Sequence, residues 1–416
     1  MAQPMQGDGL AWLVGANAAL LQVAGALKSI PFFGSLPIDL TVLLVLAALP
    51  LLALQAVGRR WVVAPAIGLP FAAIGALWLW LVLAGCWSAS GAVLNAKLSE
   101  IILLGPLMLL TGMVVAGDDT ALRGFSTATL GAGVVIAISL AENLAEGEVA
   151  LGGLPGAEAE KWRIAYQVTG LAITMAAALA ALHWAEAQRA GARFFWLGMT
   201  LALSIAALLP AARAALVALG LCLALGPALI FLRQQKPWRA TFWVMGLGLL
   251  SALGLMSGAD AAASHARALD RLLAPETLES SGRLPLWGAA LALAGDAMPF
   301  GLGTGGFSLA AGFGEWRGRH PHNLALEALV EAGLPGFALW LAAFGGAGFA
   351  IWRLGRRAPS WRVARIMVLC LPIAVTLQVS TDLGNRMAWL ALGLALGLGL
   401  GVEAKGKRGQ HVRAMG

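Results

Sequence analysis

Stretches of apolar residues long enough to cross a lipid bilayer recur along the whole chain. A helix needs about 20 such residues to span the hydrocarbon layer. Only 12% of the 416 residues are charged and 59% are hydrophobic, whereas a soluble domain carries about 25% charged residues. This composition excludes a soluble enzyme, a nucleic-acid-binding domain and a disordered chain. It predicts an all-α polytopic membrane protein with about twelve spans, near residues 11–28, 38–57, 63–85, 98–116, 122–141, 164–185, 194–210, 212–232, 240–257, 325–352, 362–380 and 386–402.

One apolar run is too long for a single span. The run from Phe194 to Leu232 has 39 residues and would measure about 58 Å as one helix, nearly twice the membrane core. Pro210 lies near its middle, and Arg213 follows. An arginine at the bilayer centre costs at least ~2.5–3.5 kcal/mol, whereas at a turn it costs little. We therefore expect two helices with Arg213 at the turn between them.

The net charge of +7 is explained by an excess of basic residues on one side of the membrane. With an even number of spans, both termini lie on one side, and that side collects 17 of the 28 basic residues and five of the 21 acidic ones. Cytoplasmic loops of membrane proteins are enriched in Lys and Arg. We therefore expect both termini in the cytoplasm, and no nucleic-acid partner.

These spans divide the chain into four expected parts. Residues 1–256 hold the first nine spans and an acidic periplasmic loop at 142–163. Residues 257–323 form a large periplasmic cap between the ninth and tenth spans, with helical pieces near 260–274 and 284–296. Residues 324–402 hold the last three spans, and residues 403–416 form a basic cytoplasmic tail. Long loops are usually functional or disordered, so we expect the chemistry in the cap.

The densest polar run is Arg317–Asn323, which reads R-G-R-H-P-H-N. Proline favours the first position of a helix, so Pro321 predicts His320 as the N-cap and His322 in the first turn. The positive end of the helix dipole disfavours imidazolium, which would keep His322 a neutral base near pH 7. Alternatively, His322 only starts a helix, or His320 and His322 bind a metal with a further ligand such as His265.

Other polar residues allow more than one interpretation. Asn323, Glu327 and Glu331 recur at intervals of four and share one helix face, where they orient a base or line a polar seam. Arg213 and Arg283 suit phosphate oxygens or anchor helices at the membrane interface. The glycine pattern of 301–306 lacks the preceding strand that a dinucleotide site requires, so it predicts a turn of close backbone approach. Asp382 and Arg386 are spaced to pair with each other.

A segment of about 56 residues resembles a known family. From Ser281 to Gly336 the chain carries S-G-R at 281–283, H-P-H-N at 320–323, Glu327, and G-L-P-G at 333–336. This pattern is similar to the O-antigen ligase/polymerase superfamily. The resemblance implies a membrane-embedded (GT-C-like) glycosyltransferase in a bacterial inner membrane. It would transfer a glycan from undecaprenyl diphosphate to lipid A–core at the periplasmic face, with inversion and without a metal or other cofactor.

The resemblance also implies residue roles. His322 would be the catalytic base, and Arg283 and Arg213 would bind the diphosphate. We expect His320, Asn323, Arg319 and Arg386 to contact the substrates. An O-antigen polymerase, which extends a carrier-linked repeat, is the first alternative. A lipid-linked glycan transporter is the second; the sequence shows no internal repeat that would favour it.

Overall fold

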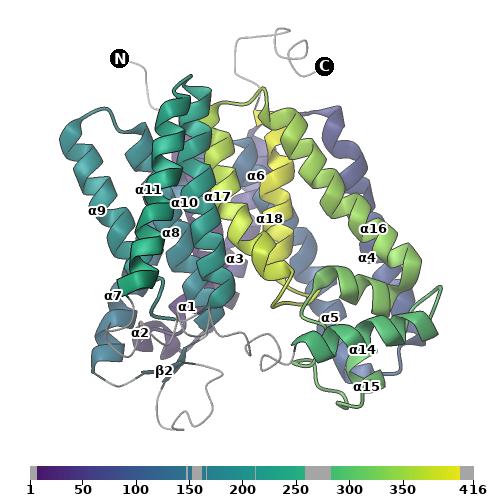
Figure 1. Cartoon of the computed structure of the whole chain (residues 1–416). Coiled ribbons are helices and arrows are strands. Elements are labelled where there is room, and N and C mark those ends of the chain that lie inside the picture. Colours follow the sequence, from purple (N-terminus) through teal and green to yellow (C-terminus); the bar gives the residue numbers. More distant parts are fainter. Residues whose placement is uncertain are drawn as a thin grey trace. The chain divides into compact units, whose positions relative to one another are not determined.

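The computed structural model describes residues 7–146, 149–151, 162–164, 166–210, 212–257 and 283–402, which are predominantly helical (Figure 1). The polytopic all-α membrane fold expected from the sequence is confirmed. Two pairs of three-residue strands accompany the helices. Strand β1 (Trp61–Val63) pairs antiparallel with β4 (Leu400–Val402), and β2 (Val149–Leu151) pairs parallel with β3 (Trp162–Ile164).

A helix occupies each of the twelve stretches expected to span the membrane. Two are shorter apolar helices, Ala190–Ala206 and Arg386–Gly399, and one is α11 (Pro237–Ser257). The number of spans and their sidedness stay predictions. Within the described residues, nine helical stretches are long and apolar enough to cross a membrane: Asp8–Leu27, Leu40–Gly58, Pro65–Trp87, Gly91–Gly117, Asp119–Asn143, Tyr166–Glu186, Arg213–Arg233, Leu324–Gly355 and Ser360–Leu377.

The chain divides into two compact units, each built from three segments. The first comprises Met1–Gly58, Asp119–Ala274 and Pro359–Val375. Within it, α1 packs closely on α7, because Gly15 and Gly124 let the two backbones touch. Helix α1 spans Gly7–Leu27 and α7 spans Asp119–Ala145. The other helices of this unit are α2 (Pro31–Gly34), α3 (Leu40–Gly58), α8 (Tyr166–Glu186), α9 (Ala190–Ala206), α10 (Arg213–Arg233), α11 and most of α17 (Ser360–Leu377).

The expected break in the long apolar run is confirmed in this first unit. Helix α9 ends at Ala206 and α10 begins at Arg213. Backbone hydrogen bonds of the turn type follow α9, from Leu208 to Ile205 and from Leu209 to Ala206. Arg213 is therefore the first residue of α10, as the cost of burying its charge in mid-membrane requires.

The second unit comprises Arg59–Asp118, Pro275–Ala358 and Thr376–Gly416. It contains the whole of the described polar run around His322. Helix α4 packs on α16, α14 packs on α16, and α6 packs on α18. Its helices are η1 (Pro65–Ile67), α4 (Gly68–Ala84), η2 (Gly85–Trp87), α5 (Gly91–Ser99), the π-turn η3 (Glu100–Leu104), α6 (Gly105–Gly117), α14 (Arg283–Asp296), α15 (Phe307–Ala310), α16 (Leu324–Gly355), α18 (Arg386–Leu396) and η4 (Gly397–Gly399).

The helix expected over 325–352 is present as α16, but it is divided by a kink. Gly333 has φ 67° and ψ −164° and divides α16 into two helices, 324–332 and 334–355. This backbone region is essentially restricted to glycine. A side chain on Gly333 would also lie 2.1 Å from the carbonyl oxygen of Pro299. The residues after His322 thus form a short separate helix, and the long helix starts beyond it.

Candidate active site

His322 lies in a loop that ends just before the short helix 324–332. The helix begins at Leu324 with Asn323 as its N-cap, because the Asn323 side chain accepts a hydrogen bond from the Leu326 N–H at 3.0 Å. Asn is among the preferred N-cap residues. The expectation that His320 caps the helix and that His322 lies in its first turn is therefore wrong. His322 precedes the cap and has a left-handed backbone, with φ 55°.

The environment of His322 favours its neutral form. Burial lowers the pKa of His322 to about 4, and the charges of His320 and Arg283 act in the same direction. The imidazole is neutral as expected, but burial and not the helix dipole is the main cause. A neutral imidazole at pH 7 can accept a proton.

His320 packs against His322 from the same loop. The two ring centroids are 4.0 Å apart, and His320 Nδ1 lies 3.2 Å from the carbonyl oxygen of Arg317. Burial lowers the pKa of His320, although the negative charge of Asp382 opposes this effect. Among the described residues, no hydrogen-bond partner contacts His320 Nε2 or His322 Nδ1. Both of these ring nitrogens are buried.

Two of the expected arginines act on this pair of histidines. Arg283 opens α14 and is half-buried, and its charge contributes to the lowered pKa of His322. Arg319 has the same effect, and its guanidinium lies 5.1 Å from the ring centroid of Trp316 and 5.4 Å from that of Phe313. Both cations thus lie close enough to the imidazole to influence its charge. The structure brings Arg283, Arg319, His320 and His322 together.

The loop 378–385, between α17 and α18, supports His322 from the other side. The His322 ring makes a hydrogen bond with the backbone of Ser380, which opposes the lowering of its pKa by burial. The Asn323 amide donates to the Gln378 carbonyl at 3.1 Å. Asn323 thus uses its oxygen for the cap and its nitrogen for this loop. Its expected contact with substrate stays a prediction.

Arg317 joins the same loop to the π-turn η3. Its guanidinium donates to Asp382 at 3.0 Å and to both carboxylate oxygens of Glu100 at 2.6 and 2.9 Å. Burial would favour a neutral Asp382, but the charges of Lys97 and Arg317 hold the pKa of that carboxyl below its usual value. Asp382, which the sequence analysis considered as a partner for Arg386, is an ion-pair partner of Arg317.

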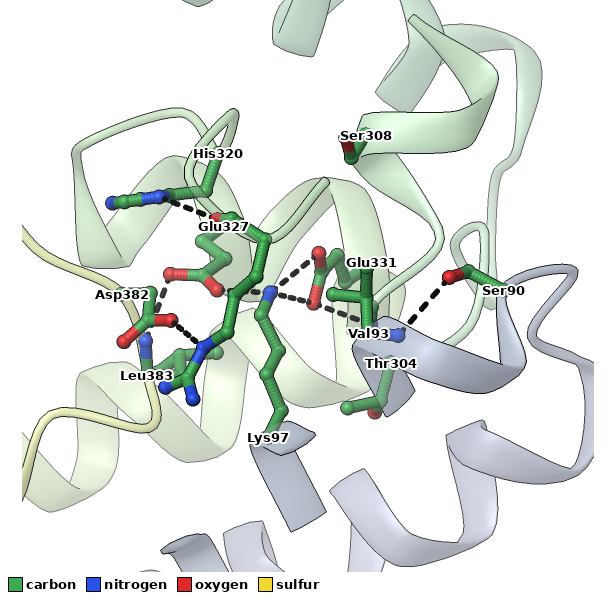
Figure 2. A network of polar contacts seen from close by, with 12 residues as sticks. Ser90, Val93, Lys97, Thr304, Ser308, His320, Glu327, Glu331, Asp382 and Leu383 are labelled. Atoms are coloured by element: carbon green, nitrogen blue, oxygen red, sulfur yellow. Dashed lines mark hydrogen bonds and ion pairs between the residues drawn. The ribbon is translucent and has the colours of Figure 1, made fainter. Parts of the chain in front are cut away.

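A buried lysine, Lys97, forms ion pairs with two glutamates of the short helix (Figure 2). Lys97 Nζ lies 2.5 Å from Glu327 Oε1 and 2.7 and 2.8 Å from the two oxygens of Glu331. The three side chains are at most 1% exposed. Sequence reasoning placed the two glutamates on one face but missed Lys97. A lone lysine inside the apolar stretch Gly91–Gly117 was the available signal, because such charges need a buried partner.

The glycine turn of 301–306 closes the end of the short helix. The Leu302 and Gly303 N–H groups donate to the carbonyls of Val330 and Glu331 at 2.9 Å, and the Trp80 indole donates to the Ala332 carbonyl at 2.7 Å. Helix ends leave such carbonyls without partners inside the helix. The close backbone approach expected of this turn is confirmed, since a side chain on Gly303 would lie 2.6 Å from the backbone of Ser88.

The remaining predicted site residues have no described contact with His322. Arg386 is half-buried at the start of α18, next to its N-cap Asn385. Arg213 is half-buried and belongs to the first unit, so its convergence with His322 stays a prediction. Ser281, His265 and the expected helix at 260–274 lie outside the described residues, whereas the expected helix at 284–296 is confirmed as α14.

The segment that contains His322 matches a known family. Residues 198–341 match the family described as O-antigen ligase. Over this range the chain is similar to the O-antigen ligase superfamily. The matched range includes Arg213, Arg283 and the H-P-H-N run, and it ends before Asp382. A search of curated proteins finds no match to the chain.

Proposed function

We propose that the protein is an O-antigen ligase that transfers a glycan from undecaprenyl diphosphate to lipid A–core at the periplasmic face of the bacterial inner membrane. The observation that carries the proposal is the half-buried imidazole of His322, which burial and the Arg283 charge keep neutral, inside the range that matches the O-antigen ligase family. A base next to a cation is the pair that a transfer from a lipid diphosphate needs.

The proposed reaction is a single displacement at the anomeric carbon. His322 takes the proton from an acceptor hydroxyl as the hydroxyl oxygen attacks, and the bond between the anomeric carbon and the diphosphate oxygen breaks. Arg283, with Arg213, binds the diphosphate and offsets the negative charge that develops on it. The lipid diphosphate leaves as a stable anion. One displacement inverts the anomeric centre and forms no glycosyl-enzyme intermediate.

The acceptor decides between ligase and polymerase. Purified protein in proteoliposomes is supplied with undecaprenyl-diphosphate-linked glycan and lipid A–core, with a chelator present. We expect glycan attached to lipid A–core. Elongated carrier-linked glycan as the sole product would instead identify a polymerase, and movement of the donor across the bilayer without bond formation would identify a transporter.

His322→Asn tests the base directly. Asparagine is the non-glycine residue that best tolerates the left-handed backbone of position 322, so the variant keeps the loop but lacks the imidazole. We expect the transfer rate to fall about 10²–10⁴-fold, the usual contribution of a general base, with an unchanged apparent melting temperature. A transfer rate equal to that of the wild type would end the assignment of His322 as the base.

A further inference from the structure

The Lys97 cluster is tied to two loops through the two oxygens of each glutamate. Glu327 uses Oε1 for Lys97 and Oε2 for the Leu383 N–H, at 2.9 Å. Glu331 Oε2 accepts hydrogen bonds from Lys97 Nζ and from the Gly305 N–H, each at 2.8 Å, and Glu331 Oε1 accepts a further one from Lys97 Nζ. Glu327 therefore holds the loop 378–385, and Glu331 holds the glycine turn.

The loop that Glu327 holds is the one that supports His322. The backbone of Ser380 in this loop makes a hydrogen bond with the His322 ring, and Gln378 accepts from Asn323, the residue after His322. Lys97 is thus connected to His322 through the Glu327 side chain and the loop 378–385.

Stability alone does not account for the cluster. Two carboxylates share one ammonium group in a site that is almost inaccessible to solvent, and burying charges in this way costs about as much as the pairing returns. A cluster retained at such cost is expected to fix a geometry. The geometry that Glu327 fixes is that of the His322 loop.

We propose that Lys97 and Glu327 are positioning residues for His322: Lys97 fixes the Glu327 carboxylate, which fixes the loop 378–385 against the catalytic imidazole. This inference rests on the proposed function, because His322 must be the base. The side chains of Lys97 and Glu327 are at most 1% exposed, so a substrate has no access to them. Their loss should therefore lower kcat and leave KM for the donor nearly unchanged.

The two glutamates provide a matched pair of variants. Glu327→Gln leaves one acceptor oxygen where the native side chain uses two, so the bond to Lys97 or the bond to Leu383 is lost. Glu331→Gln keeps an oxygen that can serve both Lys97 and Gly305. Each variant removes one negative charge and leaves Lys97 with one carboxylate. We expect Glu327→Gln to lower kcat about 10–100-fold, as a misplaced catalytic group does, and Glu331→Gln to change kcat less than about threefold.

The measurement is transfer of glycan to lipid A–core in proteoliposomes, with donor concentration varied to separate kcat from KM. Glu327→Asp is a second test, since it keeps the charge that balances Lys97 but withdraws the carboxylate from Leu383. Glu186→Gln is the control: it removes the negative charge and one of the two bonds of 2.7 Å that Arg365 donates to Glu186 in the first unit. We expect it to lower the apparent melting temperature without changing kcat.

A double variant separates positioning from general destabilisation. In the His322→Asn background, Glu327→Gln should leave the residual rate unchanged, because the positioned imidazole is gone. A further fall as large as that in the wild type overturns the inference. Equal losses in Glu327→Gln and Glu331→Gln, a raised KM with kcat retained, or failure of both Glu327 variants to fold also overturn it. A fully active His322→Asn overturns the proposed function instead.

Discussion

At the scale of single residues, contacts within the protein fix the position of the His322 ring without a substrate. His322 has a left-handed backbone and a ring held between His320 and the loop 378–385. A non-glycine residue in this conformation costs about 1–2 kcal/mol, and such strain persists only where surrounding contacts impose it. The Asn323 cap fixes the residue that follows His322, and the Ser380 backbone holds the His322 ring.

The lowered pKa of His322 predicts the pH dependence of transfer. A general base works only when neutral, so the rate is retained above its pKa and lost as the pH falls through it. With a pKa of about 4 instead of 6.5, kcat/KM should stay level from neutral pH down to about pH 5. The acid limb of kcat should lie at higher pH, because a bound diphosphate favours imidazolium. A kcat/KM limb centred near 6.5 in steady-state assays would contradict this environment.

At the scale of elements, the break in α16 isolates the short helix 324–332 from the long helix that follows. The carbonyls at its end are satisfied by the glycine turn and by Trp80, so the helix stops at the same residue without exposing polar backbone. The side chains of Glu327 and Glu331 therefore stay aligned on Lys97. The break is a fixed part of the site.

Gly333→Ala tests this break. Any side chain would adopt a backbone region that costs about 1–3 kcal/mol and would collide with the Pro299 carbonyl. We expect a lower apparent melting temperature in detergent and a lower transfer rate. Gly348→Ala in the same helix is the control, because a side chain there would meet nothing within 4 Å. Equal melting temperatures for the two variants would show that the break is not required.

The sequence predicted the positions of the helices better than the exact start of the short helix or the pairing of distant side chains. A helix lies in each of the twelve apolar stretches that hydropathy indicated, and Pro210 with Arg213 located the break before α10. The start of the short helix was placed three residues early, since Pro321 suggested a cap that the Asn323 side chain provides. Lys97 was missed because its partners lie more than 200 positions away, and hydropathy carries no information on such pairing.

At the scale of the whole molecule, the expected topology places the end of the third span in the periplasm. Cys86 in η2 is exposed, whereas Cys222 in α10 is buried. A membrane-impermeant maleimide should therefore label Cys86 in intact spheroplasts, and Cys86→Ser should abolish the labelling. In that background, Gln234→Cys, at the exposed turn after α10, should react only after permeabilisation. The reverse pattern would invert the topology.

The ion cluster also dictates when the enzyme becomes active during its synthesis. Lys97, Glu327 and Leu383 come from three distant parts of the second unit, and a chain is made from its N-terminus. The lysine is therefore made some 230 residues before the first glutamate that neutralises it, and the loop that braces the imidazole is translated later still. On the proposed function, a nascent chain therefore transfers glycan slowly until the ribosome has passed residue 383 and the loop can contact Glu327.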